Sequence, residues 1–127
     1  MCFDYMKDLI GITELDEIKT YIETKENVKV TLRRAKTDEC WKQGHSPHYD
    51  IGTGQAECDY SSSTLKTTGF KGGEFVFLDE NDNEIDVIDT AEHYNKTLIF
   101  DVSHKHKVNP HYDGDRVVDI YFWVITT

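Results

Sequence analysis

Two short triplets, His48-Tyr49-Asp50 and His111-Tyr112-Asp113, are the parts of this sequence whose residue types and spacing could bind a metal ion. In an extended segment, residues i and i+2 point to the same side, so the imidazole and the carboxylate of one triplet can reach one ion. Two imidazoles and one carboxylate on one face of an octahedron form an iron(II) site that keeps open positions for a co-substrate and oxygen. Such a site needs a second histidine from a distant strand.

The order of the histidines favours the first triplet. No histidine follows His111-Tyr112-Asp113, whereas four follow His48-Tyr49-Asp50, namely His93, His104, His106 and His111. The residue pattern alone leaves the choice among these four open. His104 and His106 are two residues apart and share one face if they lie on a strand.

The elements that must position these residues are one N-terminal helix and a series of short strands. Leu15, Ile18, Tyr21 and Ile22 recur at helical spacing, which predicts that residues 1–26 form a helical segment. Strand-like runs follow at 28–32, 60–68, 73–78, 85–88, 97–102 and 117–126, and no helix is expected after residue 27. This order predicts a mainly β fold of the jelly-roll type with the helix packed on one sheet.

Length and charge limit the function classes. A chain of 127 residues can bury one core, so we expect a single domain over 1–127, with a helical segment at 1–26 and the jelly-roll core at 27–127. The net charge of −10 repels phosphate, so neither nucleic acid nor a membrane surface is an expected partner. The three cysteines have no metal-type spacing and no secretory leader is apparent, which predicts a cytoplasmic protein.

Several motifs in the C-terminal two-thirds resemble those of the iron(II)- and 2-oxoglutarate-dependent oxygenases, in particular the prolyl-hydroxylase branch. These motifs, in family order and at similar separations, are His48-Tyr49-Asp50, Gly69-Phe70-Lys71-Gly72-Gly73-Glu74-Phe75-Val76-Phe77, His106-Lys107-Val108-Asn109-Pro110 and Gly114-Asp115-Arg116. The resemblance implies a double-stranded β-helix. It also implies a dioxygenase that hydroxylates a C–H bond of a peptide, a protein or a small molecule while 2-oxoglutarate is converted to succinate.

The resemblance also implies roles for individual residues. His48, Asp50 and His106 would bind Fe(II), and Arg116 would pair with the far carboxylate of 2-oxoglutarate. No catalytic residue is expected beyond the metal ligands, and ascorbate is a further candidate cofactor beside Fe(II), 2-oxoglutarate and O2. Arg116 begins the last predicted strand, where the even positions Val118, Ile120 and Phe122 share its face and would keep the arginine–carboxylate pair dry.

Two departures from the family pattern keep alternative functions open. Leu65 stands where prolyl hydroxylases usually carry a tyrosine, and no tyrosine lies between Tyr21 and Tyr49. One alternative is a non-catalytic jelly-roll binding protein in which the iron and 2-oxoglutarate sites are weakened. Another is a cupin-type metal enzyme with His48, His104 and His106 around one metal and no 2-oxoglutarate.

Overall fold

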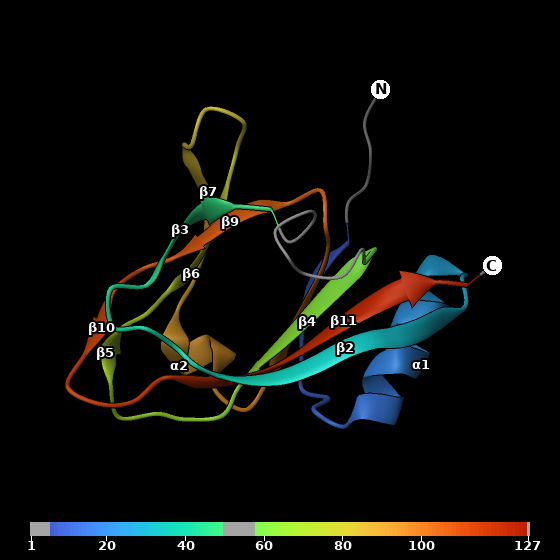
Figure 1. Cartoon of the computed structure of the whole chain (residues 1–127), viewed down its shortest axis with the longest axis horizontal. Coiled ribbons are helices and arrows are strands. Elements are labelled where there is room, and N and C mark those ends of the chain that lie inside the picture. Colours follow the sequence, from blue (N-terminus) through green and yellow to red (C-terminus); the bar gives the residue numbers. More distant parts are fainter. Residues whose placement is uncertain (1–5, 50–57, 127) are drawn as a thin grey trace.

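The computed structural model describes residues 6–49 and 58–126 and is mainly β (Figure 1). One antiparallel sheet has the strand order β1 (Lys7–Ile10), β8 (Thr97–Asp101), β4 (Tyr60–Leu65), β11 (Val117–Ile125) and β2 (Val30–Glu39). A second has the order β3 (His45–His48), β9 (Lys105–Val108), β6 (Phe75–Leu78) and β7 (Glu84–Ile88). The short strands β5 (Lys71–Gly72) and β10 (His111–Tyr112) pair with each other. The expected mainly β class is confirmed, and the two facing sheets are consistent with a jelly roll.

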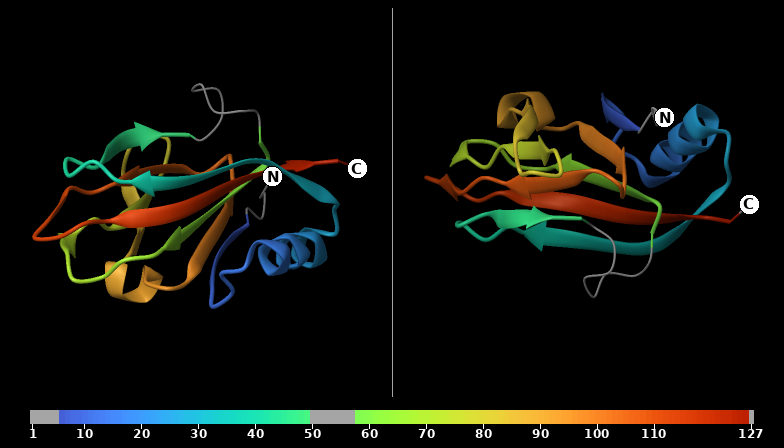
Figure 2. Two further views of the ribbon diagram at one scale, coloured as in Figure 1. Left: turned by 60° about the horizontal axis from the view of Figure 1, so that its bottom comes forward. Right: turned by 90° about the horizontal axis from the view of Figure 1, so that it is seen from above.

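The five-stranded sheet is covered on both faces. On one face, Tyr60, Ile99 and Trp123 form a buried cluster with Ile18 and Ile22 of helix α1 (Leu15–Glu26). On the other face, Leu98 and Phe100 of β8 pack against Phe75, Phe77 and Val108 of the four-stranded sheet. The helix therefore lies outside the two sheets, beside the end of β11 that leads to the C-terminus (Figure 2).

The N-terminal segment differs from the expected continuous helix. Lys7–Ile10 form the edge strand β1, which pairs antiparallel with β8, and α1 begins only at Leu15. The helix ends at Glu26, and its C-cap is Asn27, which has a left-handed φ of 54°. An apolar pair as short as Leu9-Ile10 has no clear period, so its partner strand decides its conformation.

A second helix was not expected after residue 27, yet Thr90–His93 form the short helix α2. Its N-cap is Asp89, whose side chain accepts a hydrogen bond from the backbone N–H of Ala91 at 3.1 Å. The helix is a single turn, and a segment this short carries no amphipathic repeat in the sequence. Within the described residues, no helix is long and apolar enough to cross a membrane.

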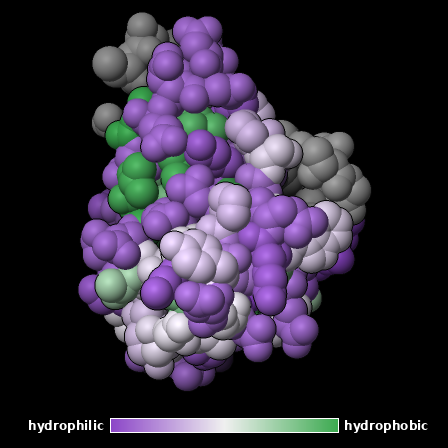
Figure 3. Space-filling model, turned by 90° about the vertical axis from the view of Figure 1, so that its left-hand side faces the viewer, coloured by the Kyte–Doolittle hydropathy of each residue, from purple (hydrophilic) through white to green (hydrophobic). Residues whose placement is uncertain are grey.

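The end of the molecule that carries β5 and β10 is largely hydrophilic (Figure 3). A hydrophobic area lies in the upper part of this face, where β7 forms the edge of its sheet. Ile85 and Val87 of this strand are exposed.

Candidate metal and co-substrate site

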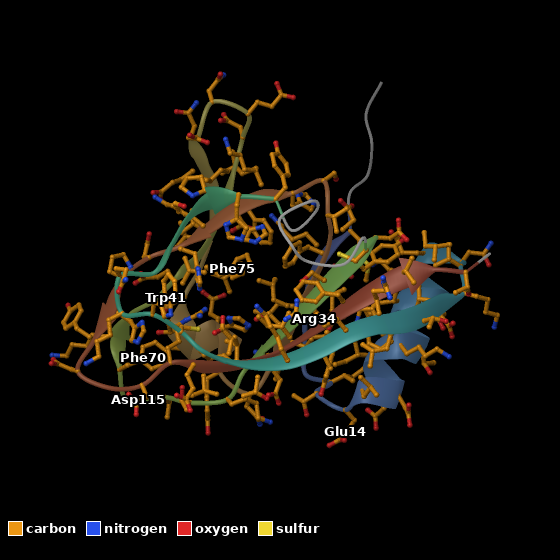
Figure 4. All side chains as sticks on the ribbon, in the orientation of Figure 1. Glu14, Arg34, Trp41, Phe70, Phe75 and Asp115 are labelled. Atoms are coloured by element: carbon orange, nitrogen blue, oxygen red, sulfur yellow. The ribbon has the colours of Figure 1, made fainter. Side chains whose placement is uncertain are left out.

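A cavity of about 130 Å³ lies between the two sheets. Its apolar lining comes from both sheets and consists of Phe75, Phe100, Val108, Val118, Ile120 and Phe122. Its polar lining consists of Lys36, Asp38, Cys40, His45, His48, Ser61, Ser63, His106 and Arg116. Phe75, labelled in Figure 4, projects into the space between the sheets. The even-numbered face predicted for the last strand is the face that lines this cavity.

The structure brings His48 and His106 together from distant parts of the sequence. They are directly opposite each other in the antiparallel pair of β3 and β9, and their ring centroids are 4.3 Å apart. His106 is buried, and its ring stacks on Phe75 with centroids 4.9 Å apart. The pairing of β3 with β9 is therefore what positions the two imidazoles side by side.

Hydrogen bonds to backbone carbonyl groups define the tautomers of both rings. Nδ1 of His48 lies 2.7 Å from the carbonyl oxygen of Ser46, and Nδ1 of His106 lies 3.1 Å from that of His104. A carbonyl oxygen only accepts, so each Nδ1 donates its proton, and in the neutral form of each ring the lone pair is on Nε2. A metal-binding histidine is commonly oriented in this way, with its second nitrogen donating to a backbone oxygen.

A complete metal site needs a donor from outside the described residues. Among residues 6–49 and 58–126, no group of three histidine, cysteine or acidic side chains is arranged to hold a metal ion. Asp50, the predicted carboxylate ligand, lies outside the described residues. His104, the alternative to His106, packs against Phe77 with ring centroids 5.4 Å apart and is not among the residues that line the cavity.

Arg116 lines the same cavity and is buried. Its Nε donates a hydrogen bond to the carbonyl oxygen of Gly73 at 3.0 Å, and its Nη1 donates to Sγ of Cys40 at 2.9 Å. In the described part of the chain, no carboxylate forms a salt bridge with this guanidinium. A buried cation whose contacts are with neutral groups is suited to receive an anionic ligand.

A tight glycine turn forms the wall behind Arg116. Gly73 has a φ of +74°, and a Cβ atom there would lie 3.0 Å from both Cδ of Arg116 and Cε2 of Phe70. Its backbone N–H donates to the carbonyl oxygen of Pro110 at 2.9 Å, which ties this turn to the segment before β10. The turn can therefore approach the arginine closely only because residue 73 lacks a side chain.

Two further residues, one in the cavity lining and one behind it, make contacts that the sequence did not indicate. Cys40 follows β2, and its side chain reaches Arg116 across the cavity wall. His93 of α2 is buried, and its Nε2 lies 2.9 Å from the carbonyl oxygen of Ser63, a cavity-lining residue. Burial lowers the pKa of His93 to about 4, although the hydrogen bond to Ser63 opposes this shift. No local pattern distinguishes these residues, because their neighbours come from remote segments.

His45 sits near the charged residues of the cavity rim. The pKa of His45 is lowered, and burial of the ring is the largest cause. The Asp38 carboxylate at 3.9 Å opposes this shift, whereas the positive charges of Arg116 and Lys36 lower the pKa further. Leu65, which stands at the expected tyrosine position, is fully buried in a cluster with Phe70 and Val118. It therefore offers an apolar contact behind the site and no hydroxyl group.

No family model matches this sequence, and no curated protein matches it. Two solved structures share the fold of this chain. One is an oxidoreductase of the 2OG-Fe(II) oxygenase family from Burkholderia pseudomallei, with a TM-score of 0.65, 19% identity, and coverage of 76% of this chain and 46% of that one. Another is a Pseudomonas putida prolyl-4-hydroxylase, with a TM-score of 0.62, 12% identity, and coverage of 87% of this chain and 62% of that one.

The resemblance inferred from the sequence motifs is thus confirmed at the level of the fold. The chain spans about half to three-fifths of the length of these two proteins. A shared fold does not by itself establish a shared reaction. The activity must therefore be argued from the cavity and its residues.

Proposed function

We propose that this chain is an Fe(II)- and 2-oxoglutarate-dependent dioxygenase that hydroxylates a C–H bond, with a prolyl-hydroxylase-like preference for a peptide or protein substrate. One observation carries the proposal. A single cavity between the sheets is lined by the adjacent imidazoles of His48 and His106 and by the buried guanidinium of Arg116.

The donor set fits a metal ion of the iron(II) type. His48 and His106 both keep the proton on Nδ1, so both present an Nε2 lone pair, the form in which a neutral imidazole binds a metal. Asp50, two residues after His48, would supply the carboxylate that completes two histidines and one acid. The cavity lining supports His106 rather than His104 as the distal ligand, which speaks against the cupin-type alternative.

The surroundings of Arg116 fit the far carboxylate of 2-oxoglutarate. A guanidinium binds a carboxylate with two charge-assisted hydrogen bonds, each worth about 1.5–3 kcal/mol. Val118 and Ile120 lie on the same face of β11 and give this part of the cavity an apolar lining. The low dielectric constant there strengthens the pairing, and the ligand in turn offsets the cost of burying the arginine charge.

The role of the protein itself would be to bind the metal and the co-substrate and to orient them relative to each other. Iron(II), 2-oxoglutarate and O2 together supply the oxidation of the C–H bond, with CO2 and succinate as the other products. His48 and His106 would hold the metal with two imidazoles in a fixed orientation, and Arg116 would orient the co-substrate relative to it. Phe75 and Phe100 would keep water away from the metal, because both rings pack within 5 Å of the His106 ring, centroid to centroid.

Anaerobic titration with Fe(II) and then 2-oxoglutarate tests this function. The wild-type chain is expected to develop the weak visible charge-transfer band of a metal-bound 2-oxoacid. Arg116→Gln should weaken 2-oxoglutarate binding while Fe(II) binding is kept, and His106→Ala should weaken Fe(II) binding. Arg33→Gln, on the exposed side of β2, is the matched control and should change neither. A wild-type chain that binds Fe(II) but never 2-oxoglutarate would refute the proposal.

A second candidate is a binding protein with the same fold and no catalysis, which the apolar, fully buried Leu65 favours. With a leucine at this position, the co-substrate has one hydroxyl partner fewer than the family pattern provides. Release of CO2 from 2-oxoglutarate in the presence of O2 and peptide libraries separates the two. Binding of Fe(II) and 2-oxoglutarate without CO2 release or a mass gain of one oxygen in any peptide would support the second candidate.

A further inference from the structure

Cys40 contacts Arg116 through both its backbone and its side chain. The backbone N–H of Cys40 donates to the carbonyl oxygen of Arg116 at 2.9 Å, and Nη1 of Arg116 donates to Sγ of Cys40, also at 2.9 Å. Sγ also lies 3.8 Å from the carbonyl oxygen of Asp38, within the range of a thiol donor. Cys40 is thus placed to accept a hydrogen bond from the arginine and to donate one to the backbone of β2, the strand that precedes it.

We propose that Cys40 is a positioning residue for the co-substrate: its neutral sulfur orients the Arg116 guanidinium while leaving the whole positive charge available to a carboxylate ligand. This inference rests on the proposed function, because it concerns how Arg116 would receive 2-oxoglutarate. It assigns to Cys40 a role that none of the sequence motifs contains.

The guanidinium is held by two neutral acceptors. Nε donates to the carbonyl oxygen of Gly73 and Nη1 to the thiol of Cys40, and no hydrogen bond from Nη2 is found among the described residues. Two anchored nitrogens define the plane of the fork. A carboxylate entering the cavity would therefore meet a cation that is already oriented but not neutralised.

The thiol stays protonated, which is what this arrangement requires. Burial raises the pKa of Cys40, the Arg116 charge opposes the shift, and the Asp38 carboxylate adds to it, with a net rise. An ionised group at this position would instead pair with Arg116 and compete with the ligand. The role of Cys40 therefore predicts that binding of 2-oxoglutarate needs a neutral hydrogen-bond acceptor at position 40 and is weakened by a negative charge there.

Charge substitution at position 40 tests the inference directly. Cys40→Asp should raise the Kd for 2-oxoglutarate by about 10–100-fold, as measured calorimetrically with Mn(II) as the metal. The aspartate carboxylate would form an ion pair with the Arg116 guanidinium and compete with the ligand. Cys40→Ser keeps a neutral acceptor and should restore binding to within about 3-fold of wild type. Ala35→Asp, on the exposed side of β2, adds the same charge outside the cavity and should leave the Kd unchanged.

A chemical measurement keeps the inference testable if Cys40→Asp does not fold. Iodoacetamide alkylates a thiolate, forming an S–C bond with loss of iodide, and mass spectrometry of the peptide that contains Cys40 gives the rate for that thiol alone. Saturating 2-oxoglutarate with Mn(II) should slow alkylation of Cys40 in wild type by at least about 5-fold, since the ligand would cover the cavity wall where the thiol lies. It should give no protection in Arg116→Gln.

The outcomes distinguish this inference from the proposed function. A wild-type chain that binds Mn(II) but no 2-oxoglutarate refutes both. If wild type binds 2-oxoglutarate and folded Cys40→Asp binds it equally well, the role of Cys40 is refuted but the proposed function is not. Alkylation of Cys40 that 2-oxoglutarate does not slow has the same meaning. A raised KM for 2-oxoglutarate in Cys40→Asp, with kcat nearly unchanged and rescue by Cys40→Ser, supports it, because a general loss of structure would not confine its effect to one substrate.

Discussion

Replacing Gly73 by alanine should disturb the co-substrate side of the cavity without touching the histidines. The added methyl group would lie 3.0 Å from Cδ of Arg116 and 3.0 Å from Cε2 of Phe70, both buried side chains. Contacts this short force the neighbours to move by a few tenths of an ångström. Because Nε of Arg116 donates a hydrogen bond to the carbonyl oxygen of Gly73 itself, the guanidinium cannot move away from residue 73 without weakening that hydrogen bond.

The expected free-energy changes have two parts. A non-glycine residue at a φ of +74° costs about 1–2 kcal/mol in unfolding free energy. Crowding against two buried side chains adds about 1–3 kcal/mol. A displaced Arg116 that loses one of its charge-assisted hydrogen bonds to the ligand would weaken 2-oxoglutarate binding by about 10–100-fold.

Gly69→Ala is the matched control for this substitution. Gly69 has a φ of +87°, so alanine there pays a comparable backbone cost, but a Cβ atom at this position has no heavy atom within 4 Å. Chemical denaturation of both variants isolates the crowding contribution as the difference between them. Calorimetric titration with 2-oxoglutarate and Mn(II) should show near wild-type affinity for Gly69→Ala and weakened affinity for Gly73→Ala. Equal affinities in the two folded variants would refute the reasoning about Arg116.

Three other perturbations test the packing on both sides of the five-stranded sheet. The pKa of His93 in the folded state is about 4, below its ordinary value of 6.5, so its contribution to stability is present above pH 6.5. As the pH falls toward 4, the unfolding free energy should decrease by about 3 kcal/mol. His93→Gln should flatten this part of the curve of stability against pH, and an unchanged curve would contradict the lowered pKa. Ile22→Ala, in the fully buried face of α1, should lower the unfolding free energy by about 2–5 kcal/mol in urea titrations, and a loss under 1 kcal/mol would mean that α1 is not packed as described. Trp123→Phe removes a 3.1 Å hydrogen bond to Oγ of buried Ser62 and should cost about 1–3 kcal/mol by the same assay, whereas Tyr112→Phe, at an exposed position, should cost almost nothing.

Much of the β architecture is predictable from local sequence. Strand-like runs in the sequence mark β4, β6, β7, β8 and β11 to within a few residues of their observed bounds, and β-branched and aromatic residues are most frequent in β11. Strand parity correctly separates the cavity-lining face of β11, with Phe122, from the opposite face, where Trp123 packs against α1. These features depend on residues near each other in sequence, so the sequence alone contains the information.

Short or polar elements were not predictable in the same way. β1, β3 and β9 have four residues each, and the sequence His45-Ser46-Pro47-His48 has little β propensity. Their strand conformation comes from hydrogen bonds to partners far along the chain. Propensity is a weak guide where such long-range pairing decides the outcome.

By itself, then, the sequence determined a mainly β chain, the motif residues that could bind a metal and a dicarboxylate, and the face of the last strand beside them. Only the tertiary structure decided that His48 lies opposite His106, that Arg116 is buried without a described carboxylate partner, and that Cys40 is one of the neutral groups that hold it. The physical reason is that the period of a strand follows from neighbouring residues, whereas the pairing of β3 with β9 and the burial of a guanidinium against a thiol depend on segments that meet only when both sheets have formed.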